Sequence, residues 1–252
     1  MPETSNISDR MARILVVVAT LATLAVNAAA AAGLINRVTP AEVSAQFSTA
    51  ITPAGYAFTI WTVIYIGMLA FSAYQMRAAT TDRFRDIRWV YVGSCVLNCA
   101  WIFFWQYAMV AVCLVIITLL AASLLIICYR LREPSSFMEA LVTKTPFGIY
   151  LGWVTCAVLV NLAICLGSVG GMDAQSRVLG VVLIVIAAVG AFLARWKLSN
   201  YLYPLAVAWA LTAIAIEHSG NTAIVIASAF ATVACLVTAG SVVTILKDST
   251  SE

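Results

Sequence analysis

The side chains that could do chemistry in this chain are aromatic rings and amides, set inside an otherwise apolar, helix-length segment. The segment reads YLGWVTCAVLVN and runs from Tyr150 to Asn161. At about 100° per residue, Trp153, Ala157 and Asn161 fall on the same helix stripe as the tyrosine. An indole N–H or an amide in membrane hydrocarbon needs a polar partner, because no water supplies one there. The stripe therefore faces either another helix or a ligand.

Two earlier segments carry stripes of the same kind. The first consists of Trp61, Tyr65, Met68 and Ser72, and the second of Ser94, Asn98, Trp101 and Trp105. Aromatic residues at this spacing commonly pack in a core, and tryptophans near helix ends commonly anchor a helix at the membrane surface. Asn98 and Asn161 lie well inside their segments, however, where polar side chains usually face the bundle interior. We therefore expect a shared internal pocket, with packing alone as the alternative.

The elements that position these stripes must lie in a membrane. Of the 252 residues, 63% are hydrophobic and 10% are charged, with a mean hydropathy of +1.00, whereas about 25% are charged in a soluble protein. Apolar runs of spanning length predict an all-α, polytopic membrane helix bundle with about eight transmembrane helices. The runs cover residues 13–34, 56–77, 87–107, 109–129, 145–167, 178–195, 199–216 and 222–246. The sixth run is short.

Basic residues are distributed unevenly among the loops. With a cytoplasmic N-terminus, only Arg37 and Arg177 of the fourteen basic residues fall in outside loops. This pattern follows the positive-inside rule and would be lost if one helix were added or removed. We expect a multi-pass protein of a bacterial inner (plasma) membrane with both termini cytoplasmic. The first run could also be a cleaved signal peptide, since small residues follow at 28–33, but its length and the charge pattern favour a retained helix.

The residue types offer little for chemistry other than binding. None of the seven cysteines belongs to a CxxC or Cys/His cluster, and the single histidine, His218, is accompanied only by Glu217. We therefore expect no metal site, no cofactor and no catalytic residue. The net charge of +3 comes from basic loops and gives no indication of nucleic-acid binding. No charged residue lies in the middle of a predicted helix, which weakens the alternative of a secondary transporter or permease using the same cavity.

The motifs on these segments follow one another in a set order. TPAGYAFTIWTVIY begins at position 52, after an outside loop of residues 36–55 that acts as a lid or as a plain connector; NCAW begins at 98, and YLGW at 150. In this order and spacing, residues 12–167 resemble the TspO/MBR family, also called translocator protein, peripheral benzodiazepine receptor or tryptophan-rich sensory protein. The chain departs from the family's Pro-Pro-x-Trp and Gly-Pro pattern. Thr52 replaces the first proline, Gly55 stands where the tryptophan is expected, and Phe58-Thr59 replaces Gly-Pro.

The resemblance implies a five-helix bundle that binds tetrapyrroles and, in some members, sterols and benzodiazepine-type drugs. Carried over by motif, the ligand-binding candidates are Tyr56, Trp61, Asn98, Trp101, Trp153 and Asn161. Their rings can stack on a planar macrocycle while the amides bond its polar edge. Porphyrin or haem would then be a ligand and not a cofactor.

These observations predict an integral membrane protein of TspO type that senses, carries or scavenges porphyrin-like or other planar hydrophobic molecules. Porphyrin degradation, claimed for part of the family, would have to rely on aromatic chemistry and is not expected. The predicted parts are a cytoplasmic tail (1–12), a TspO-like bundle (13–167), three additional transmembrane helices (168–246) and a second cytoplasmic tail (247–252). The expected partners are the lipid bilayer and the ligand. Gly148 and Gly152 lie opposite the aromatic stripe, so we expect that face to pack on another helix, in a homodimer or among the three additional helices.

Overall fold

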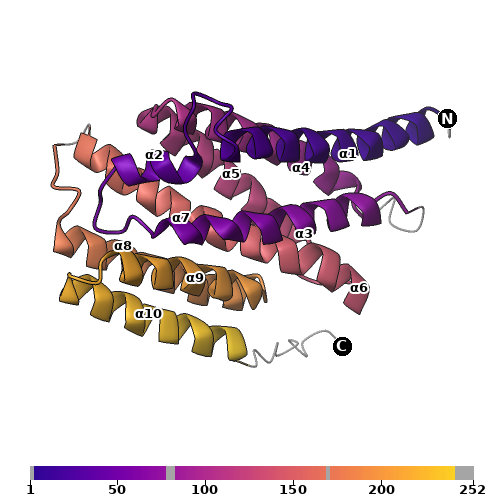
Figure 1. Cartoon of the computed structure of the whole chain (residues 1–252). Coiled ribbons are helices and arrows are strands. Elements are labelled where there is room, and N and C mark those ends of the chain that lie inside the picture. The colour runs from indigo at the N-terminus through magenta and orange to yellow at the C-terminus, as the bar shows by residue number, and fades with distance from the viewer. Residues whose placement is uncertain (1–2, 78–82, 169–170, 242–252) are drawn as a thin grey trace.

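The computed structural model describes residues 3–77, 83–168 and 171–241, and within these ranges every regular element is a helix (Figure 1). The long helices are α1 (Glu3–Ala31), α3 (Ile60–Tyr74), α4 (Arg85–Gln106), α5 (Val110–Arg130), α7 (Thr145–Ser168), α8 (Arg177–Lys197), α9 (Leu202–Glu217) and α10 (Thr222–Gly240). The short ones are α2 (Pro40–Gln46), the 3₁₀ helix η1 (Gly55–Thr59), α6 (Phe137–Glu139) and the π-helix η3 (Ala140–Lys144). The prediction of an all-α, polytopic helical bundle is confirmed.

Each of the eight predicted runs corresponds to a long helix, but one of these helices is shorter than a bilayer span. In the described ranges, seven helices are long and apolar enough to cross a membrane, and α9 is not among them. With 16 residues, α9 is about 24 Å long, whereas the hydrocarbon core measures about 30 Å. The helix of the sixth run, α8, has 21 residues and is not the short one.

Helix α9 tolerates this length because other helices surround it. It packs against α7, α8 and α10, and nine of its residues are buried. Its N-terminus is held by Asn200, whose Oδ1 accepts the backbone N–H groups of Leu202 and Tyr203. The Nδ2 of Asn200 donates to the carbonyl of Lys144 at the end of η3, 2.7 Å away. A helix buried by protein on most sides does not have to match the bilayer thickness.

Figure 1 shows that α1 begins and α10 ends at the same end of the bundle, while α2 lies at the opposite end. An even number of passes gives this arrangement, as the distribution of basic residues requires. The cytoplasmic location of both termini stays a prediction. The predicted tail at 247–252, and the last helix beyond residue 241, lie outside the described residues.

Helix α7 approaches α9 closely at Gly148 and Gly152, which carry no side chains. A Cβ added at Gly152 would lie 2.7 Å from the carbonyl oxygen of Tyr203 and 2.9 Å from the Cβ of Ala206. One added at Gly148 would clash with the side chain of Asn200. Small residues allow such close helix contacts in membranes. The expectation that this face packs on another helix is confirmed, and the partner is one of the three additional helices. A homodimer stays a prediction.

We expect Gly152→Ala to destabilise the protein by about 1–3 kcal/mol, because the new methyl group has no room at the α7–α9 contact. The midpoint of thermal unfolding in detergent measures the change. The matched control is Gly93→Ala on α4, where an added Cβ meets nothing within 4 Å. The control should be neutral or stabilising, because alanine favours a helix over glycine by about 0.5–1 kcal/mol. Equal losses in both variants would contradict the packing argument.

Candidate functional site

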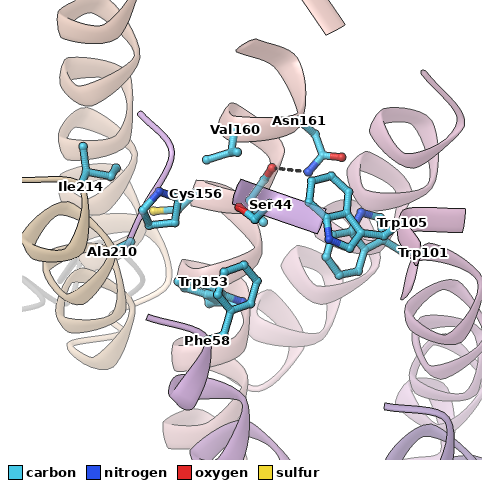
Figure 2. A pocket seen from close by; sticks show the side chains of 12 residues that line it. Ser44, Phe58, Trp101, Trp105, Trp153, Cys156, Val160, Asn161, Ala210 and Ile214 are labelled. Atoms are coloured by element: carbon cyan, nitrogen blue, oxygen red, sulfur yellow. Dashed lines mark hydrogen bonds between the residues drawn. The ribbon is translucent and has the colours of Figure 1, made fainter. Parts of the chain in front are cut away.

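A small cavity (Figure 2) lies beside α2, which is found at one end of the bundle (Figure 1). It is formed by α4, α7, α9 and the segment between α1 and α3, residues 32–59, which we call the covering segment. Its lining consists of Ser44, Pro53, Phe58, Trp101, Trp105, Trp153, Cys156, Ala157, Val160, Asn161, Ala210 and Ile214. The cavity volume is about 30 Å³, which holds roughly one or two water molecules. The site is therefore nearly closed in this conformation.

Two pairs of aromatic rings form much of the cavity wall (Figure 2). The indoles of Trp101 and Trp105 on α4 are stacked, with ring centroids 5.4 Å apart and an interplanar angle of 20°. Phe58 and Trp153 meet edge to face at 5.8 Å and 79°. Ring faces and edges arranged in this way suit a flat, apolar molecule.

The stripe on α7 is positioned as the helical spacing predicts. Trp153, Ala157 and Asn161 all line the cavity. The Nδ2 of Asn161 donates to the carbonyl of Ala157 at 2.8 Å, a bond within the same helix. Its Oδ1 has no hydrogen-bond partner among the described residues. An unpaired buried polar atom costs about 1–3 kcal/mol, so this amide is incompletely satisfied in the closed cavity.

The two indoles on α4 differ in their hydrogen bonding. The Nε1 of Trp105 donates to the carbonyl of Pro40 at 3.1 Å. The Nε1 of Trp101 is buried and finds no acceptor in the part of the chain that the structure describes. The cavity lining therefore contains one unpaired donor, on Trp101, and one unpaired acceptor, on Asn161.

Asn98 belongs to a hydrogen-bonded network and lies outside the cavity lining. Its side chain is fully buried, its Nδ2 donates to the hydroxyl of Tyr150 at 2.7 Å, and its Oδ1 accepts from the Nδ2 of Asn27 at 2.7 Å. The network joins α1, α4 and α7, and it satisfies the Asn98 amide without a ligand.

Two further candidates also lie outside the lining. The ring of Trp61 contacts Tyr150 at 5.7 Å and Trp153 at 6.4 Å, so it forms a layer behind the cavity wall. Tyr56 is 38% exposed and packs edge to face on Trp209 of α9, with centroids 5.4 Å apart. Of the six candidates, the structure thus brings Trp101, Trp153 and Asn161 into the lining and leaves Tyr56, Trp61 and Asn98 outside it.

The lining also includes residues that were not candidates from the sequence. They are Ser44, Pro53, Phe58, Trp105, Cys156, Ala157, Val160, Ala210 and Ile214. Trp105 and Ala157 could have been found, since each lies on one of the predicted stripes. Ala210 and Ile214 of α9 could not, because small and aliphatic residues in an apolar helix carry no signal for a site.

The covering segment has its own local structure and is more than a plain connector. A capping box begins α2: the hydroxyl of Thr39 accepts the N–H of Glu42, and the N–H of Thr39 donates to the Glu42 carboxylate at 2.7 Å. The latter bond lowers the pKa of Glu42. Further along, the hydroxyl of Thr52 accepts the N–H of Thr49 and donates to the carbonyl of Phe47. Thr52, which departs from the family's proline, thus closes a turn with its side chain.

Hydrogen bonds tie the first half of the covering segment to the end of α4. The Nδ2 of Asn36 donates to the carbonyl of Gln106 at 2.7 Å. In return, the amide nitrogen of Gln106 donates to the carbonyl of Val38, and the indole of Trp105 donates to Pro40. The cavity-lining Trp105 therefore also holds α2 in place.

The second half of the covering segment is tied to α9 and to the loop before α8. The N–H of Ala54 donates to the carbonyl of Ala213 at 3.2 Å, and the Nε1 of Trp209 donates to the carbonyl of Ala57 at 3.0 Å. The N–H of Ala50 donates to the carbonyl of Ala174 at 2.9 Å, in the loop before α8. Helix α9 therefore both supplies cavity wall and holds the segment that covers it.

Comparison with known proteins identifies one family. A family model described as TSPO-like protein matches residues 13–242. The match continues beyond residue 167, where the motif resemblance ends, and includes α8, α9 and α10. No curated protein and no solved structure matched the chain.

We expect Asn98→Leu to lower the free energy of unfolding by about 1–3 kcal/mol, because it leaves buried groups on Asn27 and Tyr150 without a partner. Thermal unfolding of Asn98→Leu, Tyr150→Phe and the double variant measures the network. The two losses should be less than additive, since both variants disrupt the same hydrogen bond. Strictly additive losses would show that the two side chains act independently.

We expect Trp209→Phe to loosen the covering segment, because it keeps a ring beside Tyr56 but removes the N–H that donates to Ala57. Amide hydrogen exchange at Ala54 and Ala57 should accelerate about fivefold, the effect of one lost hydrogen bond on a local opening equilibrium. The control is Trp196→Phe, which alters an indole that is 55% exposed on α8. Unchanged exchange in Trp209→Phe would mean that this bond does not hold the segment.

Proposed function

The chain belongs to the TspO family, and on that premise we propose that it is a membrane receptor for planar, hydrophobic molecules of porphyrin-like shape. The observation that carries the proposal is the cavity between the covering segment, α4, α7 and α9. Its walls are two pairs of aromatic rings with only a few polar atoms among them. Mostly apolar walls with a few placed polar groups are typical of small-molecule sites.

The volume of the cavity determines how such a ligand would enter. Sites for drug-sized molecules measure roughly 300–1,000 Å³, whereas this cavity measures about 30 Å³. Ligand binding therefore requires an opening movement. The covering segment supplies Ser44, Pro53 and Phe58 to the wall, so its displacement enlarges the cavity without moving a long helix.

Opening costs the hydrogen bonds of the covering segment and the burial of its apolar side chains, among them Val43, Ile51 and Ala57. The covering segment is held on each side by a few hydrogen bonds, and each contributes about 0.5–1.5 kcal/mol. A ligand that buries its rings against Trp101, Trp105 and Trp153 offsets such a cost. A site that encloses its ligand in this way suits sensing, carrying and scavenging alike.

We expect Trp153→Ala to weaken the binding of protoporphyrin by about 1–3 kcal/mol, through the loss of an aromatic wall of the cavity. Purified protein is titrated with protoporphyrin, haem and a sterol, and the quenching of tryptophan fluorescence or the displacement of protoporphyrin gives the affinity.

The matched control is Trp89→Ala, which removes an indole that is 58% exposed on α4, near the end of the bundle away from the cavity. The control should bind like the wild type. If both variants retain full affinity, the ligand binds elsewhere, and if the wild type binds none of the three, the proposed function is wrong.

A further inference from the structure

The cavity lining contains two unpaired polar atoms that are complementary to each other. Trp101 is 3% exposed and Asn161 is 1% exposed. The Nε1 of an indole donates hydrogen bonds and cannot accept them, whereas the Oδ1 of an amide accepts hydrogen bonds and cannot donate them. Across the described residues neither atom has a partner. One group that accepts from the first and donates to the second would satisfy both.

Comparable side chains beside these two have partners. Trp105, stacked on Trp101, donates its indole N–H to Pro40. Asn98, one turn before Trp101 on α4, is bonded through both ends of its amide. In Asn161, the Nδ2 is already used by Ala157, which leaves the Oδ1 as the free end of the amide (Figure 2). The indole of Trp105 and the amide of Asn98 thus need no ligand, whereas Trp101 and Asn161 each keep one atom unpaired within the described ranges.

Both side chains stand on long helices and not on the covering segment. Trp101 belongs to α4 and Asn161 to α7, and both helices pack tightly on α5. Displacement of the covering segment would therefore enlarge the cavity and leave this donor and acceptor where they are. A hydrogen-bond donor and acceptor held by rigid helices are preorganised for a ligand.

We propose that the ligand buries one polar group that both accepts and donates, such as an alcohol O–H, with its oxygen accepting from Trp101 and its hydrogen donated to Asn161. The inference rests on the function proposed above and specifies the chemical class of its ligand. An ether at the same position satisfies Trp101 but leaves Asn161 unpaired. A hydrocarbon leaves both atoms unpaired, so it binds least tightly.

Ligands that differ in one group test the inference. One series is a porphyrin with hydroxypropyl side chains, its methyl ether and the matching alkyl porphyrin; the other is cholesterol, its methyl ether and cholestane. Affinities are measured in nanodiscs of one lipid composition, directly for the porphyrins and by porphyrin displacement for the sterols. In the scaffold that binds, each step from alcohol to ether to hydrocarbon should weaken binding by about tenfold.

Two variants separate the two hydrogen bonds. In Asn161→Leu the alcohol and the ether should bind equally, because the acceptor for the O–H is gone. In Trp101→Phe the ether and the hydrocarbon should bind equally, because the donor is gone while a ring remains. The matched control is Trp89→Phe, which removes the N–H of an indole that is 58% exposed on α4 and outside the cavity lining, and it should preserve the full order of the three ligands.

The outcomes distinguish this inference from the proposed function. If the wild type binds the hydrocarbon as tightly as the alcohol, the cavity binds flat molecules but the two polar atoms do not select among them, and the inference is overturned. The same holds if an ordered water satisfies both atoms with the ligand bound. If no compound of either scaffold binds, the proposed function itself fails.

Discussion

In hydrocarbon, a buried polar group must find its partner within the protein or in a ligand, and this constraint organises the whole bundle. Between α1, α4 and α7, amides and hydroxyls are paired with one another: Asn98 bridges Asn27 and Tyr150, and Thr20 shares a 2.6 Å hydrogen bond with Tyr91. These bonds hold three helices in register.

The buried charges follow the same constraint by lying near the end of the bundle where the chain begins. Arg88 is fully buried, and its guanidinium donates to Asp9 and to Gln75. Glu139, also buried, pairs with Arg83 in the loop before α4. At the opposite end, the aromatic cavity contains two buried polar atoms, on Trp101 and Asn161, that have no partner among the described residues. Other buried polar atoms in the described part of the chain also lack a partner, such as Nη2 of Arg88 and Oε1 of Gln106, but those of Trp101 and Asn161 belong to one cavity lining.

The close contact of α7 with α9 determines which elements form this cavity. Without side chains at Gly148 and Gly152, α9 lies near enough for Ala210 and Ile214 to join the lining. From that position its Trp209 also reaches the carbonyl of Ala57. Helix α9 is therefore part of the site, and it lies within a family match that runs to residue 242.

Much of the architecture could be predicted from periodicity and composition. Long apolar runs specify membrane helices through their length alone, and a GxxxG opposite an aromatic stripe specifies a close helix contact. The cavity could be predicted only in part. Trp101, Trp153 and Asn161 line it as expected from their helical spacing. Asn98 has the same spacing but is hydrogen-bonded to Asn27, a residue 71 positions earlier, and lies outside the lining. Tyr56 packs on Trp209, 153 positions later, and not in the cavity lining. Such long-range partners leave no mark in the local pattern of either segment.

The closed cavity is a balance between two local terms. Hydrogen bonds from α4 and α9 hold the covering segment down, and each is worth about 0.5–1.5 kcal/mol. Against them stand the unpaired atoms of Trp101 and Asn161, each at a cost of about 1–3 kcal/mol. A ligand that binds one of the two forms more tightly shifts their populations toward that form. A ligand that pairs both atoms removes the cost of burying them while the covering segment closes again over its rings. The two atoms that lack hydrogen-bond partners in the empty cavity would then both be paired in the occupied one.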